Sequence, residues 1–124
     1  MTNFALPPLG AGLPTPFAES VLDLVQQIPA GKVLSYGDVA RLLSGGGARA
    51  VGTVMARFGA GVPWHRVVRA DGSLPAGHEL EALALHRVER TPLGLDGQRI
   101  DMTRARWDPD LAPNAMSAAS VRRS

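Results

Sequence analysis

The stretch that decides the fold runs from Ser35 to Phe58 and reads SYGDVARLLSGGGARAVGTVMARF. Ser35 is a residue type that caps helices, and apolar residues then recur at helical spacing over 36–43. A Ser-Gly-Gly-Gly run ends this segment, and a second helical pattern follows over 48–58. Two short helices joined by a turn are typical of a helix-turn-helix motif, which this stretch therefore predicts.

The helix expected over 48–58 has two unlike faces. Its apolar positions fall within one arc and predict a face packed on the core: Val51, Val54, Met55 and Phe58. The opposite side holds an arginine among small residues, which lets the backbone lie close to another surface. The contact residues expected there and on the first turn are Ala48, Arg49, Ala50, Gly52, Thr53 and Ala56.

The charge of this region points to an anionic partner. Between Ser35 and Arg69, five arginines stand against the single acidic residue Asp38, so this segment has a local charge of +4. Twelve of the 13 basic residues in the chain are arginine, whose planar guanidinium suits phosphate and base recognition. An arginine excess alone fits a GC-rich coding sequence equally well. The clustering on one segment is what favours nucleic acid.

Upstream of the motif, the sequence predicts an arm and one further helix. Residues 1–15 are rich in proline and glycine and predict a disordered arm. Thr15 and Pro16 are suited to begin a helix, whose apolar positions recur from Phe17 to Ile28 before Pro29 ends it. A short extended piece over 32–34 then leads to Ser35.

Downstream, the pattern predicts a small β element and a fourth helix. The apolar stretch over 62–68, closed by an Asp-Gly turn, predicts one limb of a small wing. A helix is expected over 79–90, with Leu80, Leu83 and Val88 near one face, and a short strand over 98–102. Residues 110–124 predict a disordered tail. The expected fold is therefore mainly α with a small β element, a winged-helix-like helix-turn-helix domain over 16–109.

Composition excludes several classes of function. The 124 residues, 45% hydrophobic and 19% charged, predict one soluble domain without a membrane span. No secretory signal is recognisable, so a cytoplasmic location is expected. The chain has no cysteine, which excludes disulfides, cysteine-ligated zinc and a thiolate nucleophile. The histidines lack metal-ligand spacing and no nucleophile or carboxylate pair forms a catalytic pattern, so neither a metal nor a cofactor is expected.

Four blocks of sequence carry a resemblance to a known family: IPAGKV (28–33), SYGDVA (35–40), ARAVG (48–52) and VPWHRV (62–67). Their order and spacing resemble the C-terminal domain of O6-alkylguanine-DNA alkyltransferases over 17–109. In those enzymes a cysteine within Pro-Cys-His-Arg accepts the alkyl group, and Trp64 occupies that position here. The sequence is thus similar to the alkyltransferase-like branch of the family, as is its Trp107-Asp108-Pro109 ending.

The resemblance implies a non-catalytic DNA damage sensor. Such a protein binds O6-alkylguanine in double-stranded DNA by nucleotide flipping and flags it for nucleotide excision repair, with one monomer sufficing for each lesion. An indole cannot replace a thiolate as the alkyl acceptor, which independently argues against an enzyme. Two alternatives stay open: a residual alkyltransferase or hydrolytic DNA repair enzyme, and a sequence-specific helix-turn-helix transcription factor.

The resemblance also assigns roles to single residues. Arg49 matches the arginine that fills the space of the extruded nucleotide, and Tyr36 matches the tyrosine that helps to rotate it out. The lesion pocket is expected to consist of Tyr36, Trp64, Val67 and Ser73. Taken without the resemblance, Trp64 and Tyr36 also fit core packing, and Arg49 also fits a phosphate contact.

Three departures from the family pattern bear on the pocket. His65 matches the histidine that activates the cysteine, so without a thiol we expect a structural role for it. The partner glutamate that the resemblance implies for this histidine is not clearly identified, because Glu89 lies in the area but its register is open. The asparagine hinge before the pocket is replaced near 59–61. The loop after Ser73 also lacks the basic residue that some alkyltransferase-like proteins place over the lesion.

Overall fold

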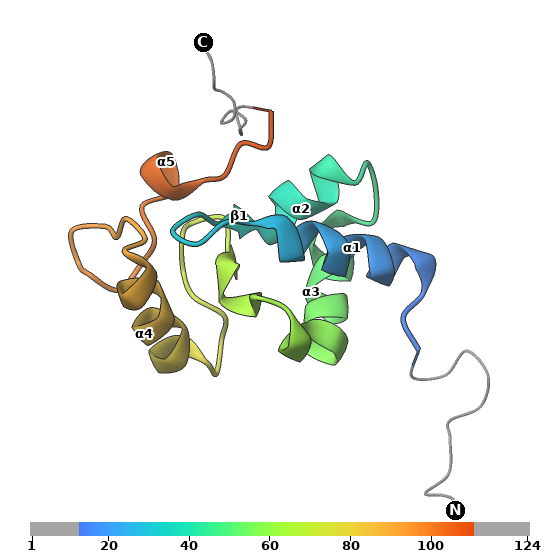
Figure 1. The fold of residues 1–124 in the computed structure, drawn as a ribbon, viewed down its shortest axis with the longest axis horizontal. Helices are drawn as coiled ribbons and strands as arrows, with labels where there is room; N and C mark the ends of the chain where they lie inside the picture. The colour runs from blue at the N-terminus through green and yellow to red at the C-terminus, as the bar shows by residue number, and fades with distance from the viewer. Residues whose placement is uncertain (1–12, 111–124) are drawn as a thin grey trace, which may run out of the picture.

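The computed structural model describes residues 13–110, in which helices surround a very short parallel sheet (Figure 1). The element order is α1, β1, α2, α3, two 3-10 turns η1 and η2, β2, α4 and α5. The fold is mainly α with a small β element, as the sequence predicts. The expectations for residues 1–12 of the arm and 111–124 of the tail lie outside the described residues.

Helix α1 spans Pro16–Gln27 and begins as expected. The Thr15 side-chain oxygen accepts a hydrogen bond from the backbone N–H of Ala18 at 3.1 Å. Pro16 takes the first helical position, where its missing N–H costs nothing. Val21 and Val25 are fully buried on the inner face, so α1 packs as an amphipathic helix on the domain core.

Helices α2, Tyr36–Leu42, and α3, Gly47–Phe58, form the helix-turn-helix pair. Ser35 begins α2 through a capping box: the Ser35 hydroxyl accepts from the Asp38 N–H at 3.0 Å, and the Asp38 carboxylate accepts from the Ser35 N–H at 2.9 Å. In the turn, Gly46 has a φ of +85°, and a Cβ there would collide with the Phe17 ring. Glycine is therefore needed at position 46 both for the backbone angle and for close packing on α1.

Asp38 also ties the motif to the C-terminal part of the domain. Its carboxylate lies 3.0 Å from the Arg41 guanidinium and 3.0 Å from the Arg106 guanidinium. Burial opposes ionisation, but the hydrogen bonds from Ser35 and the two cations outweigh it and hold the pKa of Asp38 below its ordinary value. The capping box of α2 therefore contains the ionised carboxylate of Asp38.

The sheet consists of β1, Leu34–Ser35, and β2, Val67–Val68, which pair in parallel with Ser35 opposite Val68. The wing limb expected over 62–68 is wrong in its first half, where Trp64–Arg66 forms the 3-10 turn η2. Another 3-10 turn, η1, precedes it over Gly59–Gly61. The side chains of His65 and Arg66 bond to helix α4 instead of lying beside a neighbouring strand. The Asp-Gly turn is present, and the Gly72 N–H donates to the Arg69 carbonyl at 2.9 Å.

Helix α4 spans Glu79–Glu89 and buries a face that the sequence pattern misassigns. Leu80 and Val88, expected near the inner face with Leu83, are 84% and 82% exposed. The inner face instead consists of Ala82, Leu83 and His86. An apolar pattern misses this face because its most buried member, His86, is polar and is held by hydrogen bonds.

The strand expected over 98–102 is also wrong. Only an isolated bridge joins Leu93 and Ile100, and the chain then enters the short helix α5, Met102–Ala105. Asp101 causes the change, since its carboxylate accepts from the Thr103 N–H at 3.1 Å and caps the helix. After α5, the chain runs beside Val33, whose N–H donates to the Ala105 carbonyl at 3.0 Å and whose carbonyl accepts from the Trp107 N–H at 2.8 Å.

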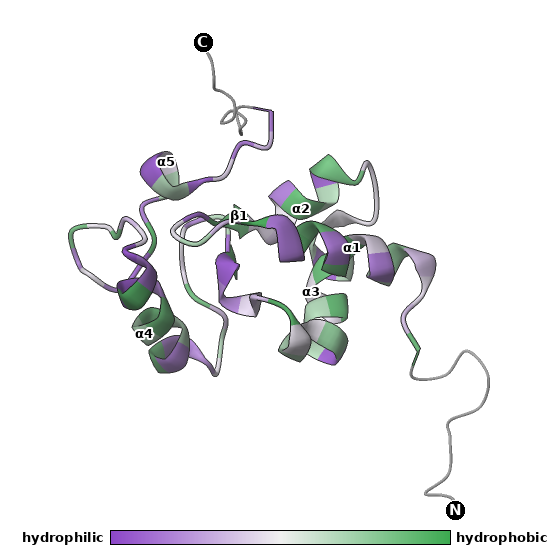
Figure 2. Cartoon of the chain, in the orientation of Figure 1, coloured by the Kyte–Doolittle hydropathy of each residue, from purple (hydrophilic) through white to green (hydrophobic). Residues whose placement is uncertain are grey.

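Two apolar clusters meet at the sheet. Leu34 and Val67 belong to the cluster beneath α1, α2 and α3, whereas Val33 and Val68 belong to the cluster between the sheet, α4 and α5. Alternate residues of each strand point to opposite faces, which explains this division. Figure 2 shows that α1 and α4 each carry both hydrophobic and hydrophilic residues, as expected for helices that pack one face on a cluster. The sheet is thus the seam between two halves of the domain.

Candidate nucleic-acid interface and base pocket

The outward face of α3 is built as the sequence predicts. Val51 and Val54 are buried, and Met55 and Phe58 are partly buried against the same cluster. The opposite residues are exposed or partly exposed: Ala48, Arg49, Ala50, Gly52, Thr53 and Ala56. Their contact with DNA stays a prediction. This face of α3 leaves room for a duplex to approach closely, because Arg49 is the only one of these six residues with a long side chain.

The arginines of the basic segment divide into two groups. Arg41 pairs with Asp38, and Arg66 pairs with Glu89 at 2.7 Å. Arg49, Arg57 and Arg69 are exposed and make no ion pair with any residue in 13–110. The charge available to an anionic partner along this segment therefore comes from these last three side chains.

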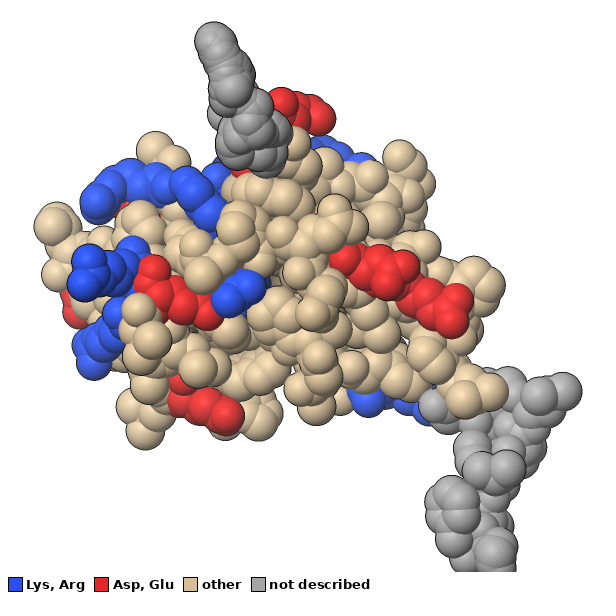
Figure 3. Space-filling view, in the orientation of Figure 1, with Lys and Arg blue, Asp and Glu red and all other residues tan. Residues whose placement is uncertain are grey.

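Charge elsewhere on the surface is arranged differently. Figure 3 shows acidic side chains over α1 and basic side chains gathered on the side of the molecule that carries α4 and α5. On that side, Arg99 and Arg104 each lie 3.7 Å from an aspartate, Asp71 and Asp101 respectively. These basic residues are thus partly neutralised by neighbours.

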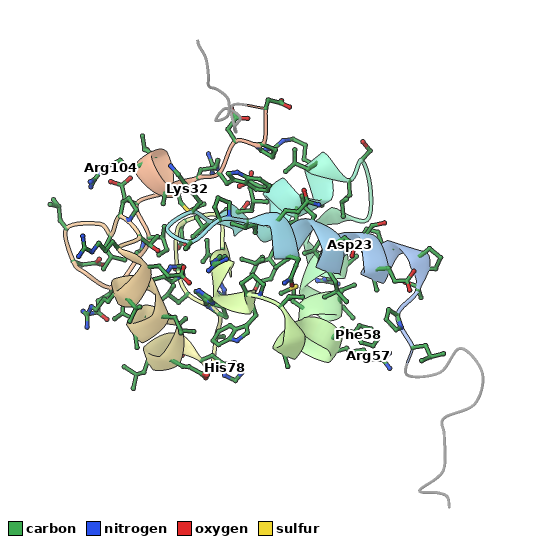
Figure 4. All side chains as sticks on the ribbon, in the orientation of Figure 1. Asp23, Lys32, Arg57, Phe58, His78 and Arg104 are labelled. Carbon is green, nitrogen blue, oxygen red and sulfur yellow. The ribbon has the colours of Figure 1, made fainter. Side chains whose placement is uncertain are left out.

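A cavity of about 530 Å³ opens between α3, the turn η2 and the start of α4. Tyr36 and Trp64, expected from the resemblance to share a pocket, both line it. Figure 4 labels Phe58 at the end of α3 and His78 beside α4, at the same edge of the molecule. The remaining lining residues are Gly52, Met55, Ala56, Gly59, Ala60, Arg69, Pro75, Ala76, His78 and Glu81.

Trp64 is both a core residue and a wall of the cavity. Its half-buried indole packs against the cluster that contains Val68 and Leu83. The rings of His65 and His78 meet it edge-on, with centroids 5.9 Å and 5.6 Å away. An aromatic plane fixed on one side and open on the other can stack against a flat ligand.

Two of the expected pocket residues do not line this cavity. Val67 is fully buried, because its pairing with Leu34 in the sheet turns its side chain into the first apolar cluster. Ser73 lies past the Asp-Gly turn and lines an adjoining hollow of about 260 Å³, which shares Arg69 and Ala76 with the cavity. Sequence reasoning did not place Arg69, His78 and Glu81 in the pocket, because the strand pairing and the packing of the start of α4 that bring them to the cavity are not encoded in a local pattern.

The structure answers the open question of where Glu89 lies relative to His65. Its carboxylate accepts from His65 Nε2 at 2.8 Å and from Arg66 Nε and Nη2 at 3.1 Å and 2.7 Å. Arg66 Nη1 also donates to the carbonyl of Ile28 at 2.8 Å. The last turn of α4 brings Glu89 to these partners, which lie more than 20 residues earlier, so sequence register could not settle the match. The histidine-glutamate pair of the family pattern is present.

His86 provides a further tie between α4 and the turn that carries Trp64. Its Nε2 donates to the His65 carbonyl at 2.7 Å, so its Nδ1 accepts from the Thr91 hydroxyl at 2.8 Å. Burial lowers the pKa of His86, which keeps the imidazole neutral. Burial acts to raise the pKa of Glu89, but the hydrogen bonds from Arg66 and His65 lower it to about 2. A carboxylate and a neutral imidazole thus fix η2 on α4.

The comparisons with known proteins agree with this geometry. Residues 16–107 match the family model for the 6-O-methylguanine DNA methyltransferase, DNA binding domain. The chain belongs to this family. Within the 6-O-methylguanine DNA methyltransferase family, a DNA base-flipping protein of Escherichia coli is 36% identical over 96 residues, which are 74% of each chain.

Solved structures of the family are similar in fold. The alkyltransferase-like protein of Schizosaccharomyces pombe, in complex with damaged DNA containing O6-carboxymethylguanine, matches with a TM-score of 0.65 at 29% identity, covering 75% of this chain and 95% of that one. The O6-methylguanine methyltransferase of Mycobacterium tuberculosis matches with a TM-score of 0.54 at 34% identity, covering 68% of this chain and 55% of that one. The helix-turn-helix fold is therefore that of the family's DNA-binding domain.

Two negative findings apply to the described part of the chain. Within residues 13–110, none of the helices is both long and apolar enough to cross a membrane. In the same range, no group of three or more histidine, aspartate and glutamate side chains is placed to hold a metal ion.

Proposed function

We propose that the domain over 16–109 is a non-catalytic sensor of alkylated DNA, which binds double-stranded DNA with α3 and holds an extruded O6-alkylguanine in the cavity beside Trp64. One observation carries this proposal. The cavity lies directly behind the exposed face of α3, and Gly52 and Ala56 belong to both. A nucleotide rotated out of a duplex bound on α3 would therefore meet the cavity without a further change of shape.

The size and lining of the cavity suit a base with an alkyl substituent. A volume of about 530 Å³ falls within the range of small-molecule sites. Trp64 and Tyr36 offer aromatic surface, and stacking of a base on an aromatic side chain contributes about 1–3 kcal/mol. An alkylated guanine pairs poorly, so unstacking it costs less than unstacking guanine. Stacking is available to either base, so the lower cost of unstacking and the apolar contact of the alkyl group with the cavity wall are what favour the damaged base.

The face of α3 suits the duplex. Arg49 is exposed on its first turns, and its Thr53 neighbour bonds back to the helix through a 3.1 Å hydrogen bond to the Arg49 carbonyl. The small residues around Arg49 allow the helix to approach a groove closely, so that the guanidinium can enter the space left by the extruded nucleotide. Arg57, at the other end of α3, is suited to a phosphate contact.

Alkyl transfer is absent from the proposed function. Trp64 takes the place of the acceptor cysteine, and the chain has no other cysteine. The pair of His65 and Glu89 is present, but no thiol is available for it to activate. We therefore assign this pair a structural role, which is to hold the turn that carries Trp64.

The proposal extends to the cellular setting. A sensor that leaves the lesion in place needs a repair system to remove it, and nucleotide excision repair proteins are the partners proposed. One cavity and one recognition helix suffice for a lesion, so the proposed active species is a monomer. We place it in the cytoplasm, on the nucleoid if the cell is bacterial.

A competition binding assay tests the proposal. Two duplexes that differ only by one O6-methylguanine are offered to the protein, and we expect it to prefer the alkylated duplex in any sequence context. A preference for one base sequence regardless of damage would instead indicate a transcription factor. Mass spectrometry of the protein after incubation with the alkylated duplex checks the second part of the proposal. A protein adduct of one methyl group would contradict it.

Substitution of Trp64 distinguishes a role in binding the lesion from a role in supporting the fold. Trp64→Ala should lower the ratio of alkylated to normal DNA affinity while leaving normal DNA binding nearly unchanged. Trp107→Ala is the matched control, because Trp107 packs against the first apolar cluster and does not line the cavity. The control should affect both affinities equally. An equal loss of both affinities for Trp64→Ala would mean that Trp64 only supports the fold.

A further inference from the structure

Arg69 is placed beside Tyr36 by the register of the sheet. The parallel strands pair Ser35 with Val68, so Tyr36 and Arg69 are the residues that follow at the same end of the two strands. Both line the cavity. The positive charge of Arg69 acts on Tyr36, where it lowers the pKa of the hydroxyl and partly opposes the rise caused by burial. Arg69 is thus an exposed residue that forms part of the cavity wall beside Tyr36.

Most of the cavity wall is uncharged, which makes this guanidinium distinctive. Besides Arg69 and Tyr36, the titratable lining residues are His78 and Glu81, whose side chains lie 3.9 Å apart. The nearest carboxylate in sequence, Asp71, lies 3.7 Å from Arg99 instead. Among residues 13–110, no carboxylate forms an ion pair with Arg69. The cavity wall therefore carries a guanidinium that is not ion-paired with any acidic side chain in this range, and the Glu81 carboxylate on the same wall lies beside His78 instead.

We infer that Arg69 is a specificity-determining residue, which makes the cavity prefer O6-alkylguanines whose alkyl group ends in a carboxylate over neutral alkyl groups of similar size. This inference rests on the proposed function. A guanidinium forms short, charge-assisted hydrogen bonds to a carboxylate, and its fork can hold both oxygens at once. A neutral alkyl group of the same length gains only apolar contact, which the wall around Trp64 and Met55 offers to either adduct.

The main alternative is that Arg69 contacts a DNA phosphate. It is exposed, as Arg49 and Arg57 are, and a phosphate contact would strengthen binding to every duplex. The two roles differ in what they discriminate. A phosphate contact changes affinity for damaged and undamaged DNA by the same factor, whereas a cavity contact changes affinity only for the adduct that it touches.

The test measures affinities for three duplexes of one sequence, carrying O6-carboxymethylguanine, O6-propylguanine or guanine at the same position. For the unaltered protein we expect the carboxymethyl adduct to bind about fivefold tighter than the propyl adduct, an advantage typical of a solvent-exposed ion pair. Arg69→Gln should abolish this ratio, and Arg69→Lys, which keeps the charge, should retain part of it. Arg57→Gln is the control, because Arg57 is an exposed arginine that does not line the cavity.

Each outcome bears on one proposal. If Arg69→Gln removes the carboxymethyl preference while Arg57→Gln leaves it intact, the inference holds. If both adducts bind better than guanine but their ratio is the same in the unaltered protein and in Arg69→Gln, the inference is wrong and the proposed function stands. Equal weakening of all three duplexes by Arg69→Gln identifies a phosphate contact and also overturns it. If neither adduct binds better than guanine, the proposed function itself fails.

Discussion

The two halves of the domain are held together by different chemistry. Residues 13–58 form three helices around a cluster of apolar side chains, and the buried polar residues among them are the capping-box pair Ser35 and Asp38. Residues 59–110 contain short turns and helices whose positions depend on buried polar contacts, above all those of Glu89 and His86. The first half makes a surface for α3, and the second half makes the wall that carries Trp64. The cavity is thus lined by both halves, and its Trp64 wall is the part that directional bonds hold in place.

The largest expected loss of stability lies in the second half, residues 59–110, which buried polar contacts hold together. Glu89→Gln removes the charge that compensates Arg66 and weakens the bond to His65, so we expect the free energy of unfolding to fall by about 3 kcal/mol. Urea denaturation of both proteins measures this. Glu81→Gln on the same helix is the control and should change stability by less than about 0.5 kcal/mol. Equal effects of the two substitutions would mean that the contacts of Glu89 do not hold the second half.

The first half, residues 13–58, should lose most stability when a buried apolar side chain is shortened. Val51 is fully buried on α3, and Val51→Ala should cost about 2 kcal/mol through lost burial and the void left behind. Val88→Ala removes the same groups from a side chain that is 82% exposed and should cost less than about 0.5 kcal/mol. A similar cost at both positions, measured by thermal unfolding, would contradict the burial assigned to them.

A smaller effect is expected at the start of α2. Ser35→Ala deletes the hydroxyl that accepts from the Asp38 N–H and should lower stability by about 1 kcal/mol. Ser20→Ala, on the exposed face of α1, is the matched control. Should the control lose as much stability as Ser35→Ala, the capping box would not be the source of the loss.

The smallest expected effect is a pH dependence near neutral pH, which arises from His86 in the second half. Because burial lowers the pKa of His86 in the folded protein, protons bind more readily to the unfolded chain. This share of stability is fully present above the unfolded pKa of about 6.5 and is lost as pH falls below it. Denaturation at about pH 7.5 and about pH 5.5 measures the loss. His86→Gln, which keeps a donor toward the His65 carbonyl, should reduce the difference between the two pH values.

A second acid step belongs to Glu89. Its folded pKa of about 2 lies below the ordinary value of 4.5, so the carboxylate contributes stability above that ordinary value. This contribution is lost as pH falls from there toward about 2. The step at lower pH should persist in His86→Gln and shrink in Glu89→Gln, which distinguishes the two groups.

The sequence predicts the first half well because its signals are local. A cap at Ser35, a glycine run and the spacing of Val51 and Val54 each act within a few residues, so they can be interpreted without the rest of the chain. The second half defeats such reasoning at specific points. Leu80 and Val88 carry an apolar pattern that the structure leaves exposed, and Asp101 turns an expected strand into the start of α5.

The candidate site divides in the same way. The outward residues of α3 follow from helical spacing, and Tyr36 and Trp64 follow from the family resemblance. Val67 is buried in the core and does not line the cavity. A two-residue strand has too little alternation to predict which way its side chain points. Arg69 and Glu89 owe their positions to strand pairing and to a contact across more than 20 residues, which no local pattern encodes.

The contacts of Val33 have a consequence for folding during synthesis. The backbone of Val33 lies just before the helix-turn-helix motif, yet its N–H and carbonyl are paired with Ala105 and Trp107. A chain emerging from the ribosome offers α1, α2 and α3 long before those partners exist. The three helices can collapse early, but the edge beside β1 stays open until the last described segment arrives. Closure of the domain is therefore a late event, and a nascent chain stalled before residue 105 would expose an unpaired strand edge to its neighbours.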